Sequence, residues 1–485
     1  MCYRGSVSFQ KYVTRVGDRS YNSYELPRRY PEKKVRKVCM QPSVVIAASS
    51  WWPLAAKIAV SLLEHGCKVE AVCAPGHPLR YVRGISKYHH YSRLRSLASL
   101  TNALRKASPD VVIPCDDGVV LQLHQIYQEQ PGLREMLSRS LGEAKNFAVV
   151  ASREQLQNVA QELGIRVPRS MPIKTQGELD TWFDWPVNRA VLKQDGTWGG
   201  RGVRVVESKA AAVAELEEML KPLGWAVVAK RMAVDRDPIA LWSRKDRTPV
   251  VTLQEYIPGR PANLMMACWQ GEILGAVTAE VMQAQGATSA AMVVRLIDHP
   301  EIAQAACRLA NRLQLSGFYG VDFILEEGSR AAYLLEMNPR CTQLGHLPVD
   351  GQGDLVGLLC RQLKADPAIS AEKRFGLRPG DTVAFFPKVT SLNVGSELLH
   401  AYQDTPWQRP ELVEELLKPS WPNRQWPARL YHWVRPPRSE KPVAFAERNA
   451  QATTGAEGVP SGVTRTLASV GGNTNISRAS SGSPW

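Results

Sequence analysis

A pair of apolar strands in the second half of the chain carries three polar side chains that constrain the fold more than any other feature. The first strand covers residues 320–325 and contains Asp322, and a tight turn at residues 326–329 leads into the second strand. The second strand contains Glu336 and Asn338. Because alternate residues of an extended strand share a face, these two side chains point the same way. We therefore expect an antiparallel hairpin that brings Asp322 opposite this pair.

The oxygen atoms of these three side chains are typical ligands of a hard divalent cation. Mg²⁺ binds a few protein oxygens and keeps its other positions for water and substrate phosphates, and Mn²⁺ accepts similar ligands. The pattern therefore predicts a Mg²⁺ or Mn²⁺ site on Asp322, Glu336 and Asn338. Pro339 ends the strand, and Arg340 then offers a fork-shaped donor to an anion beside the metal.

Residues 43–135 alternate between strand and helix patterns, which is typical of a parallel β-α-β sheet. Strands are predicted at residues 43–48, 67–74 and 110–114, and helices at residues 54–65, 94–107 and 119–128. The turn at residues 49–53 lacks a G-x-G-x-x-G motif, so we do not expect a dinucleotide there. We expect a small open parallel sheet in this region.

A glycine-rich segment, residues 196–202, lies between two predicted strands at residues 190–193 and 203–207. It lacks the G-K-S/T ending of a Walker loop. Its glycines include Gly199, Gly200 and Gly202. Such glycines allow backbone N–H groups to converge on a phosphate, Lys193 can neutralise that phosphate, and the hairpin can close as a lid. The alternative is a plain β-turn, and the downstream metal pattern leads us to favour phosphate binding.

An apolar strand at residues 253–257, stopped by Pro258 and Gly259, supplies a third element. Its backbone can hydrogen-bond to adenine while Glu255 accepts hydrogen bonds from ribose hydroxyls. The alternative is an ordinary strand end with an exposed glutamate. We interpret Gln254, Glu255, Tyr256 and Ile257 as the nucleoside-binding edge.

These elements, in this order and spacing, resemble the ATP-grasp superfamily of carboxylate–amine and carboxylate–thiol ligases. The resemblance covers about residues 151–365, and residues 43–135 resemble the domain that usually precedes this fold. The matching residues are Lys193 with the glycine-rich loop for phosphates, Gln254, Glu255, Tyr256 and Ile257 for adenosine, Asp322, Glu336 and Asn338 for magnesium, and Arg340 for the transferring phosphoryl group or the substrate carboxylate. Family members usually carry a further lysine in a Ser-Lys pair, where this chain has Ser152 and Arg153. Arginine keeps the charge and can meet a phosphate with a different geometry.

The resemblance implies an α/β chain with an ATP-grasp fold and a ligase that uses ATP and Mg²⁺. In that chemistry a substrate carboxylate attacks the γ-phosphate to give an acylphosphate and ADP, and an amine then displaces phosphate. Lys193, Arg340 and the metal would supply the positioning and charge neutralisation that phosphoryl transfer needs. We see none of the long partner domains of a biotin carboxylase or carbamoyl-phosphate synthetase, so an amino acid or small peptide is the leading substrate class. A phosphotransferase or ATP-binding regulator on the same fold is an alternative.

Two further side chains are candidates for the substrate side of the site. Arg295 ends an apolar run and is a candidate clamp for the substrate carboxylate, with an ordinary surface arginine as the alternative. His346 follows Arg340 closely, and we favour a structural role for it over a place beside the acceptor.

The segments outside these motifs complete the predicted organisation of the chain. We expect a basic flexible leader at residues 1–42, a parallel domain at 43–135, an ATP-grasp domain at 151–365 with a lid at about 170–255, an extension at 370–435 and a disordered tail at 436–485. The tail is rich in small and polar residues, which bury too little apolar surface to fold.

The net charge of +14 resembles that of a nucleic-acid-binding protein, but its distribution argues against one. Residues 1–40 hold ten Lys and Arg against three Asp and Glu, and no nucleic-acid-binding module is recognisable. A basic nucleic-acid-binding protein therefore remains the weaker alternative, and a positive cleft for ATP and carboxylates accounts for the rest. We expect ATP and small carboxylate and amine substrates as partners, and a homodimer remains open.

The nine cysteines are scattered without a C-x-x-C pair, which predicts reduced thiols in a cytoplasmic protein and no zinc site. The apolar stretch at residues 43–63 is interrupted by Pro53 and Lys57 and is better interpreted as strand, loop and helix than as a membrane span. The leader lacks a continuous apolar run, so we do not expect a secretory signal.

Overall fold

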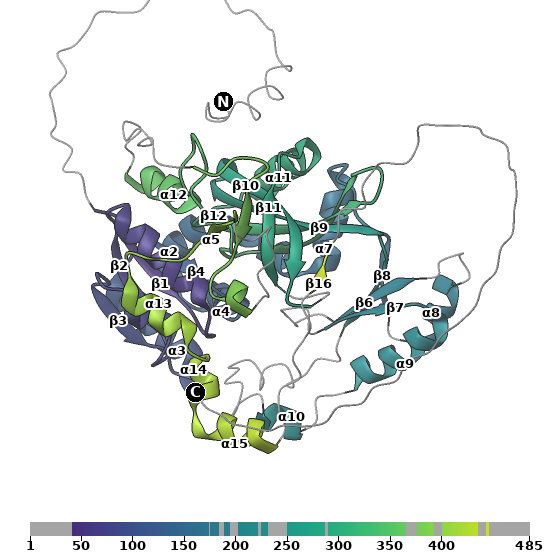
Figure 1. Cartoon of the computed structure of the whole chain (residues 1–485), viewed down its shortest axis with the longest axis horizontal. Helices are drawn as coiled ribbons and strands as arrows, with labels where there is room; N and C mark the ends of the chain where they lie inside the picture. Colours follow the sequence, from purple (N-terminus) through teal and green to yellow (C-terminus); the bar gives the residue numbers. More distant parts are fainter. Residues whose placement is uncertain are drawn as a thin grey trace, which may run out of the picture. The chain divides into compact units, whose positions relative to one another are not determined.

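The structure of the 485-residue chain is a computed structural model, and its helices and strands are labelled in Figure 1. It describes residues 41–173, 175–183, 189–194, 202–221, 225–230, 250–286, 290–364, 376–391, 400–434 and 443–445. Within these residues the strands form three sheets. The same residues contain no helix that is both long and apolar enough to cross a membrane.

The N-terminal sheet is parallel and has the strand order β3-β2-β1-β4. Its strands are β1 (Ser43–Ala47), β2 (Lys68–Cys73), β3 (Lys87–His90) and β4 (Val111–Pro114), and its helices are α2 (Pro53–Glu64), α3 (Ser96–Ala107), α4 (Asp117–Glu129) and α5 (Arg134–Leu141). Helix α2 covers one face, and α3, α4 and α5 cover the other. The predicted parallel sheet is confirmed. The sequence pattern missed β3, because its four residues, Lys-Tyr-His-His, lack an apolar run.

The largest sheet has eight strands in the order β13-β12-β9-β10-β11-β14-β15, with β16 paired to β10. These strands are β9 (Gly259–Trp269), β10 (Glu272–Ala284), β11 (Ala291–Leu296), β12 (Gly317–Glu326), β13 (Ala332–Asn338), β14 (Thr382–Ala384), β15 (Tyr402–Gln403) and β16 (Val443–Ala444). One face packs against α7 (Arg153–Glu162) and α11 (Pro300–Leu313). The other face shares a core with α2 and with α12 (Leu355–Lys364). The largest sheet and the N-terminal sheet are therefore joined by one continuous apolar core.

The third sheet is antiparallel and has the order β5-β8-β6-β7. Its strands are β5 (Ser170–Ile173), β6 (Ala190–Gln194), β7 (Val203–Val206) and β8 (Val251–Glu255). Helices α8 (Gln176–Phe183) and α9 (Lys209–Leu220) pack on one of its faces. Lys193, Thr252 and Gln254 occupy the opposite face, because they alternate with the buried Leu192 and Leu253. Strand β5 is hard to recognise from the sequence, because its Pro172 is unusual in a strand.

Residues beyond 376, expected to form a C-terminal extension at 370–435, contribute to the same core where the structure describes them. Strand β14 pairs with β11, and β15 pairs with β14. Residues 443–445, within the tail predicted at 436–485, include β16, which pairs with β10. The remaining helices are α6 (Phe147–Ala151), α10 (Trp225–Lys230), α13 (Pro410–Leu417), α14 (Trp421–Arg424) and α15 (Trp426–Val434), with 3₁₀ turns at Pro78–Tyr81, Arg93–Arg95, Pro131–Leu133, Ala144–Asn146 and Lys388–Ser391.

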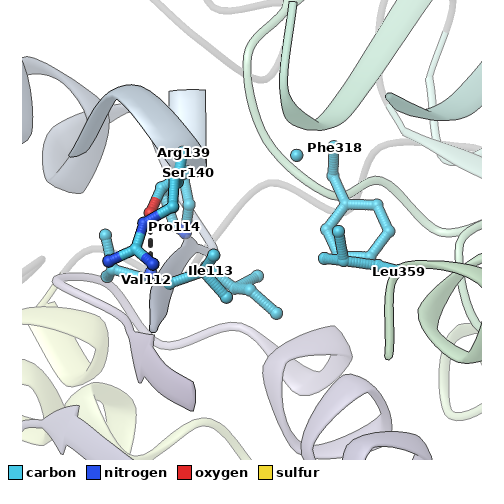
Figure 2. Close-up of a pocket in the computed structure, with 9 residues that line it drawn as sticks. Val112, Ile113, Pro114, Arg139, Ser140, Phe318 and Leu359 are labelled. Carbon is cyan, nitrogen blue, oxygen red and sulfur yellow. Dashed lines mark hydrogen bonds between the residues drawn. The ribbon is translucent and has the colours of Figure 1, made fainter. Parts of the chain in front are cut away.

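The end of α5 lies against the start of β12, and Figure 2 shows Ser140 and Phe318 among the side chains around the hollow beside this contact. The backbone N–H of Val112 donates to Ser140 Oγ over 2.9 Å. A Cβ atom at Gly317 would lie 2.2 Å from the backbone oxygen of Ser140, so this approach requires glycine. The hollow beside it, about 230 Å³ including open solvent, is lined mainly by apolar side chains such as Phe318 and Leu359. It is a packing gap between the two sheets and contains none of the predicted site residues.

Candidate functional site

The predicted acidic hairpin is present, with β12 and β13 paired antiparallel. Asp322 lies opposite Glu336, and Gly320 lies opposite Asn338. On the other side of β12, Asp322 pairs with Asn263 of β9. Cross-strand partners share a face of a sheet, so the three predicted metal ligands and Asn263 lie on one face.

Asp322 is held between two amide side chains. It accepts hydrogen bonds from Asn263 Nδ2 over 2.6 Å and from Asn338 Nδ2 over 3.0 Å. Burial, together with the charge of Glu336, raises the pKa of Asp322 to about 6. Two carboxylates at close range in a partly desolvated place repel each other. The oxygen-rich donor set therefore fits a hard divalent cation such as Mg²⁺, which would reduce that repulsion.

Glu336 is paired with a guanidinium from another element. Arg153, at the start of α7, donates to Glu336 Oε2 through Nε over 3.0 Å and through Nη2 over 2.8 Å. Burial alone would raise the pKa of Glu336, but the charges of Arg153 and Lys193 outweigh it and the pKa is lowered. Ser152 caps the helix by accepting a hydrogen bond from the N–H of Gln155.

Arg153 also connects the largest sheet to the antiparallel sheet. Its Nη1 donates to the backbone oxygen of Gln194 at the end of β6, over 3.4 Å. Lys193, one residue earlier, is only 6% exposed. The two cations predicted to meet phosphates therefore converge on Glu336 from two different elements.

The register of β8 revises the predicted nucleoside edge. Gln254 lies on the same face of the antiparallel sheet as Lys193, whereas Glu255 lies on the opposite face, where Oε2 accepts from the N–H of Arg169 over 3.2 Å. The expected ribose contact of Glu255 does not fit this register. Tyr256 and Ile257 follow the strand, with the Tyr256 ring 5.4 Å from the Arg189 guanidinium.

The glycine-rich loop is only partly described. Gly199 and Gly200 lie outside the described residues, and Gly202 accepts a hydrogen bond from the N–H of Gln194 over 2.8 Å. That bond continues the β6–β7 ladder, so the loop belongs to a hairpin as predicted.

Arg340 reaches from the acidic hairpin to the N-terminal sheet. Its Nη2 donates to Asn338 Oδ1 over 3.3 Å, and its Nε donates to Asp117 Oδ1 over 2.9 Å. Asp117 begins α4, just after β4, and the neighbouring Asp116 accepts from the backbone and hydroxyl of Ser49 after β1. Ligands of open parallel sheets bind at such carboxyl ends of strands. Sequence reasoning missed Asp116 and Asp117, although an Asp-Asp pair directly after a predicted strand was visible.

The loop after Arg340 lies against the acidic hairpin. A Cβ atom at Gly320 would lie 2.4 Å from Thr342 Cγ2, and Gly320 is the cross-strand partner of Asn338. Glycine at this position therefore lets the loop that carries Gln343 and His346 pack directly over the strands that hold the predicted metal ligands.

Arg295 does not join this group. Arg295 of β11 pairs with Glu280 of β10. The next residue of β11, Leu296, pairs with Ala279, and Ala279 pairs with Asn263 of β9, so Leu296 shares the face of Asn263. Because successive strand residues alternate, Arg295 lies on the face opposite Asn263 and the acidic hairpin. There it forms an ion pair of 3.5 Å with Glu280, which Arg260 and Arg330 also contact. The structure therefore does not support a carboxylate clamp at Arg295, whose odd-even register could not be read from the sequence.

His346 belongs to a buried ionic network. Its Nε2 lies 3.0 Å from Asp404 Oδ2, and Lys57 Nζ lies 2.5 Å from the same oxygen. Sequence reasoning missed Lys57 and Asp404, because they lie in α2 and just after β15, far apart in the chain, and neither belongs to a recognisable motif.

Comparison with known proteins agrees with this arrangement. A family model described as an ATP-grasp domain matches residues 151–343. An ADP complex of N5-carboxyaminoimidazole ribonucleotide synthetase is similar with 16% identity and a TM-score of 0.51, covering 69% of this chain and 79% of that one. The biotin carboxylase domain of a Hydrogenobacter thermophilus 2-oxoglutarate carboxylase, with MgADP, ADP and bicarbonate, has 14% identity and a TM-score of 0.51, covering 71% and 73%.

A third similar structure is an Aspergillus clavatus N5-carboxyaminoimidazole synthase with ADP and 5-aminoimidazole ribonucleotide, at 15% identity and a TM-score of 0.51, covering 71% and 82%. At these identities the likeness establishes the fold. The predicted architecture, an ATP-grasp fold preceded by a small parallel domain, is thereby confirmed. The family-model match spans the residues that carry the site, so residues 151–343 of this chain form an ATP-grasp domain.

Proposed function

We propose that this chain is an ATP-dependent, ADP-forming ligase that joins a carboxylate to an amine through an acylphosphate intermediate. The observation that carries the proposal is the convergence of Arg153, Lys193 and Arg340 on the acidic hairpin within an ATP-grasp domain. Three cations around two carboxylates and an amide suit a triphosphate and its metal, not a structural ion pair. An amino acid or small peptide is the substrate class that we favour.

Each side chain has a role that follows from its position. Asp322, Glu336 and Asn338 would hold Mg²⁺, which would neutralise charge on the β- and γ-phosphates. Lys193 would bind a phosphate in the ground state and in the transition state. Arg340, anchored by Asp117, would hold the γ-phosphoryl group or the carboxylate that attacks it. Phosphoryl transfer needs such positioning and charge stabilisation more than covalent help.

The nucleotide base would lie along β8. Gln254 is 3% exposed and shares a face with Lys193, so an adenosine along this face would have its phosphates near Lys193. Backbone groups at residues 255–257 would then meet adenine. Glu255 is not needed in this arrangement.

The test is the variant Glu336→Gln, which removes a charge from the predicted metal site while keeping the shape of the side chain. ADP and phosphate release should be measured with Mg-ATP and a panel of carboxylates, amino acids and dipeptides. The variant should lose at least about a hundredfold in turnover, in the range typical of lost electrostatic stabilisation of a transition state. Glu272→Gln, at an exposed position at the start of β10, is the matched control and should keep full turnover.

Three outcomes would count against the proposal. Full activity of Glu336→Gln at low magnesium would remove that carboxylate from the site. Pyrophosphate as the stoichiometric product would indicate adenylation of the carboxylate. ATP binding without amine-dependent ADP release would favour a phosphotransferase or a regulator on the same fold.

A further inference from the structure

A second pocket lies beside the loop that follows Arg340, between the start of α2 and the segment that joins β14 to β15. It encloses about 310 Å³, part of which is open solvent. Its lining includes Trp52, Leu54, Lys57, His346, Phe386 and Lys388. The pocket therefore draws on the N-terminal domain, on the loop after β13 and on the C-terminal part of the described chain.

The base of the pocket is a buried network centred on Asp404. Its carboxylate accepts from Lys57 Nζ over 2.5 Å, from His346 Nε2 over 3.0 Å and from the N–H of Phe386 over 2.6 Å. Lys57 and Asp404 are each 6% exposed. Three donors thus share one carboxylate, which keeps Asp404 charged and fixes the ring of His346.

The network determines which nitrogen of His346 can accept a proton. Because Nε2 faces a carboxylate, the neutral ring carries its hydrogen on Nε2 and leaves a lone pair on Nδ1. Nδ1 is buried and makes no hydrogen bond to any residue in the described part of the chain. A ligand with an N–H donor would satisfy it, and an ammonium group is the donor that gains most from this contact.

Other groups of the pocket favour an anion. Lys388 Nζ lies 5.1 Å from the centre of the Trp52 ring, and burial lowers the pKa of Lys388 to about 8. The first turn of α2 has no acidic residue and no side-chain cap, so its positive end adds to the charge of Lys388. Trp52, Leu54 and Phe386 offer apolar surface between these polar groups. One acceptor, one cation and an apolar wall match an amino acid with an apolar side chain.

The pocket is connected to the acidic hairpin by a short loop. His346 and Gln343, which line the pocket, follow Thr342, and Thr342 packs over Gly320 opposite Asn338. Asp116 lies next to Asp117, which pairs with Arg340. The Asp116 carboxylate accepts hydrogen bonds from the backbone of the loop between β1 and α2, and this loop leads to Trp52. The same two loops therefore border both the predicted phosphoryl site and the pocket.

We propose that this pocket binds the amine substrate as an apolar α-amino acid, and that His346 is a catalytic residue that removes a proton from its ammonium group. The proposal rests on the ligase function proposed above. The carboxylate of the amino acid would pair with Lys388, and its side chain would lie against Trp52 and Phe386. His346 is then part of the acceptor site, and not the structural histidine that its sequence context favours.

The step balances without any further reactant. The ammonium group passes one proton to His346 Nδ1, and the freed lone pair forms the C–N bond to the acylphosphate carbon. The bond between that carbon and the bridging phosphate oxygen breaks, and phosphate leaves with the electron pair. The second proton of the attacking nitrogen goes to the departing phosphate, which leaves as hydrogen phosphate.

The first arm of the test is direct binding, which needs neither ATP nor the second substrate. Isothermal titration calorimetry of the full chain with L-alanine, L-leucine and L-phenylalanine should show binding of at least one of them. His346→Gln should weaken that amino acid about tenfold or more, the loss expected for a hydrogen bond to a charged group. The matched acid without an amino group, which is 4-methylpentanoate for leucine, should lose much less affinity in the His346→Gln variant. His90→Gln, at an exposed histidine of β3, is the control.

The second arm is kinetic and uses the carboxylate found in the phosphate-release screen. His346→Gln should lower turnover with the amino acid about a hundredfold or more, the usual contribution of a general base. Turnover with hydroxylamine, which is largely unprotonated at neutral pH, should fall far less. A structural role would lower both together.

The outcomes separate the two proposals. Absence of amino-acid binding to the wild type, or wild-type binding by His346→Gln, overturns the pocket assignment while leaving the ligase function standing. Binding without ATP turnover supports the pocket and rejects the ligase. Should His346→Gln fail to fold, Lys388→Met tests the same pocket without disturbing Asp404. This variant should bind both leucine and 4-methylpentanoate more weakly than the wild type. Unchanged affinity for both compounds would reject the pocket assignment.

Discussion

Replacing Asp322 by asparagine should stabilise the protein while abolishing its turnover. Asp322 faces Glu336 across the strand pair, and burial with that neighbouring charge raises the pKa of Asp322 from 3.8 to about 6. Above this pH the folded protein carries a charge that its surroundings disfavour. Asparagine removes the charge and keeps the shape, so the fold loses the repulsion and the site loses a metal ligand.

The size of this stabilisation follows from the raised pKa of Asp322 and from the hydrogen bonds that its carboxylate accepts. A shift of about two pH units corresponds to about 3 kcal/mol of unfolding free energy. Against this, asparagine accepts from only one of the two amide donors, Asn263 Nδ2 and Asn338 Nδ2, and one lost hydrogen bond costs about 1 kcal/mol. We expect Asp322→Asn to gain about 1–2 kcal/mol at pH 8.

The stability difference between Asp322→Asn and the wild type depends on pH within a defined window. Between pH 3.8 and about 6 the folded state keeps the proton of Asp322 that the unfolded chain, with its ordinary pKa, has released. The unfolding free energy of the wild type therefore falls as the pH rises through this window. Asp322→Asn lacks this loss, so its advantage should be absent near pH 4 and complete above pH 6.

The assay is urea unfolding of both proteins from pH 4 to pH 8, with Asp298→Asn as an exposed control. Mg-ATP should then be added at pH 8, where it should stabilise the wild type more than Asp322→Asn, because only the wild type keeps the full ligand set. A stability difference that stays constant across the pH range would refute the account of the Asp322 charge. Equal stabilisation by Mg-ATP would remove Asp322 from the metal site.

Two further changes test the cation and the close approach in the site. Lys193→Met should both raise the apparent KM for ATP and lower kcat, by about ten- to a hundredfold together, because the cation contacts phosphates before and during transfer. Steady-state kinetics against ATP will measure both constants. Wild-type values of KM and kcat would mean that the nucleotide binds elsewhere. Gly320→Val should lower turnover through displacement of the loop at Thr342, since a Cβ would lie 2.4 Å from its methyl group; unchanged turnover with an unchanged melt would show that the loop position is unimportant.

Much of the fold and part of the site could be predicted because local patterns encode them. Asp322, Glu336 and Asn338 lie two or fewer strand positions from one another across a tight turn, so period-two alternation and a hairpin were enough to bring them together. Helices α11 and α13 begin at Pro300 and Pro410, where proline at the first turn marks a helix start.

The rest depended on register and on long-range packing. Arg295 and Glu255 each lie one residue from the face where function was expected, and a shift of one strand residue exchanges the faces. Asp404 and Lys57 are 347 residues apart, and no local pattern relates them. Such groups can be recognised only when the fold places them against each other.

Arg153 shows how a departure from the family pattern acquires meaning from the structure. An ammonium group could bind Glu336 or a phosphate, whereas the guanidinium of Arg153 donates through Nε and Nη2 to Glu336 and through Nη1 to the oxygen of Gln194. A single planar group thereby joins the acidic hairpin to the end of β6, beside Lys193. A phosphate that competes for Arg153 would weaken its hold on Glu336 and free that carboxylate for the metal. Nucleotide and metal binding should therefore be coupled through this one side chain.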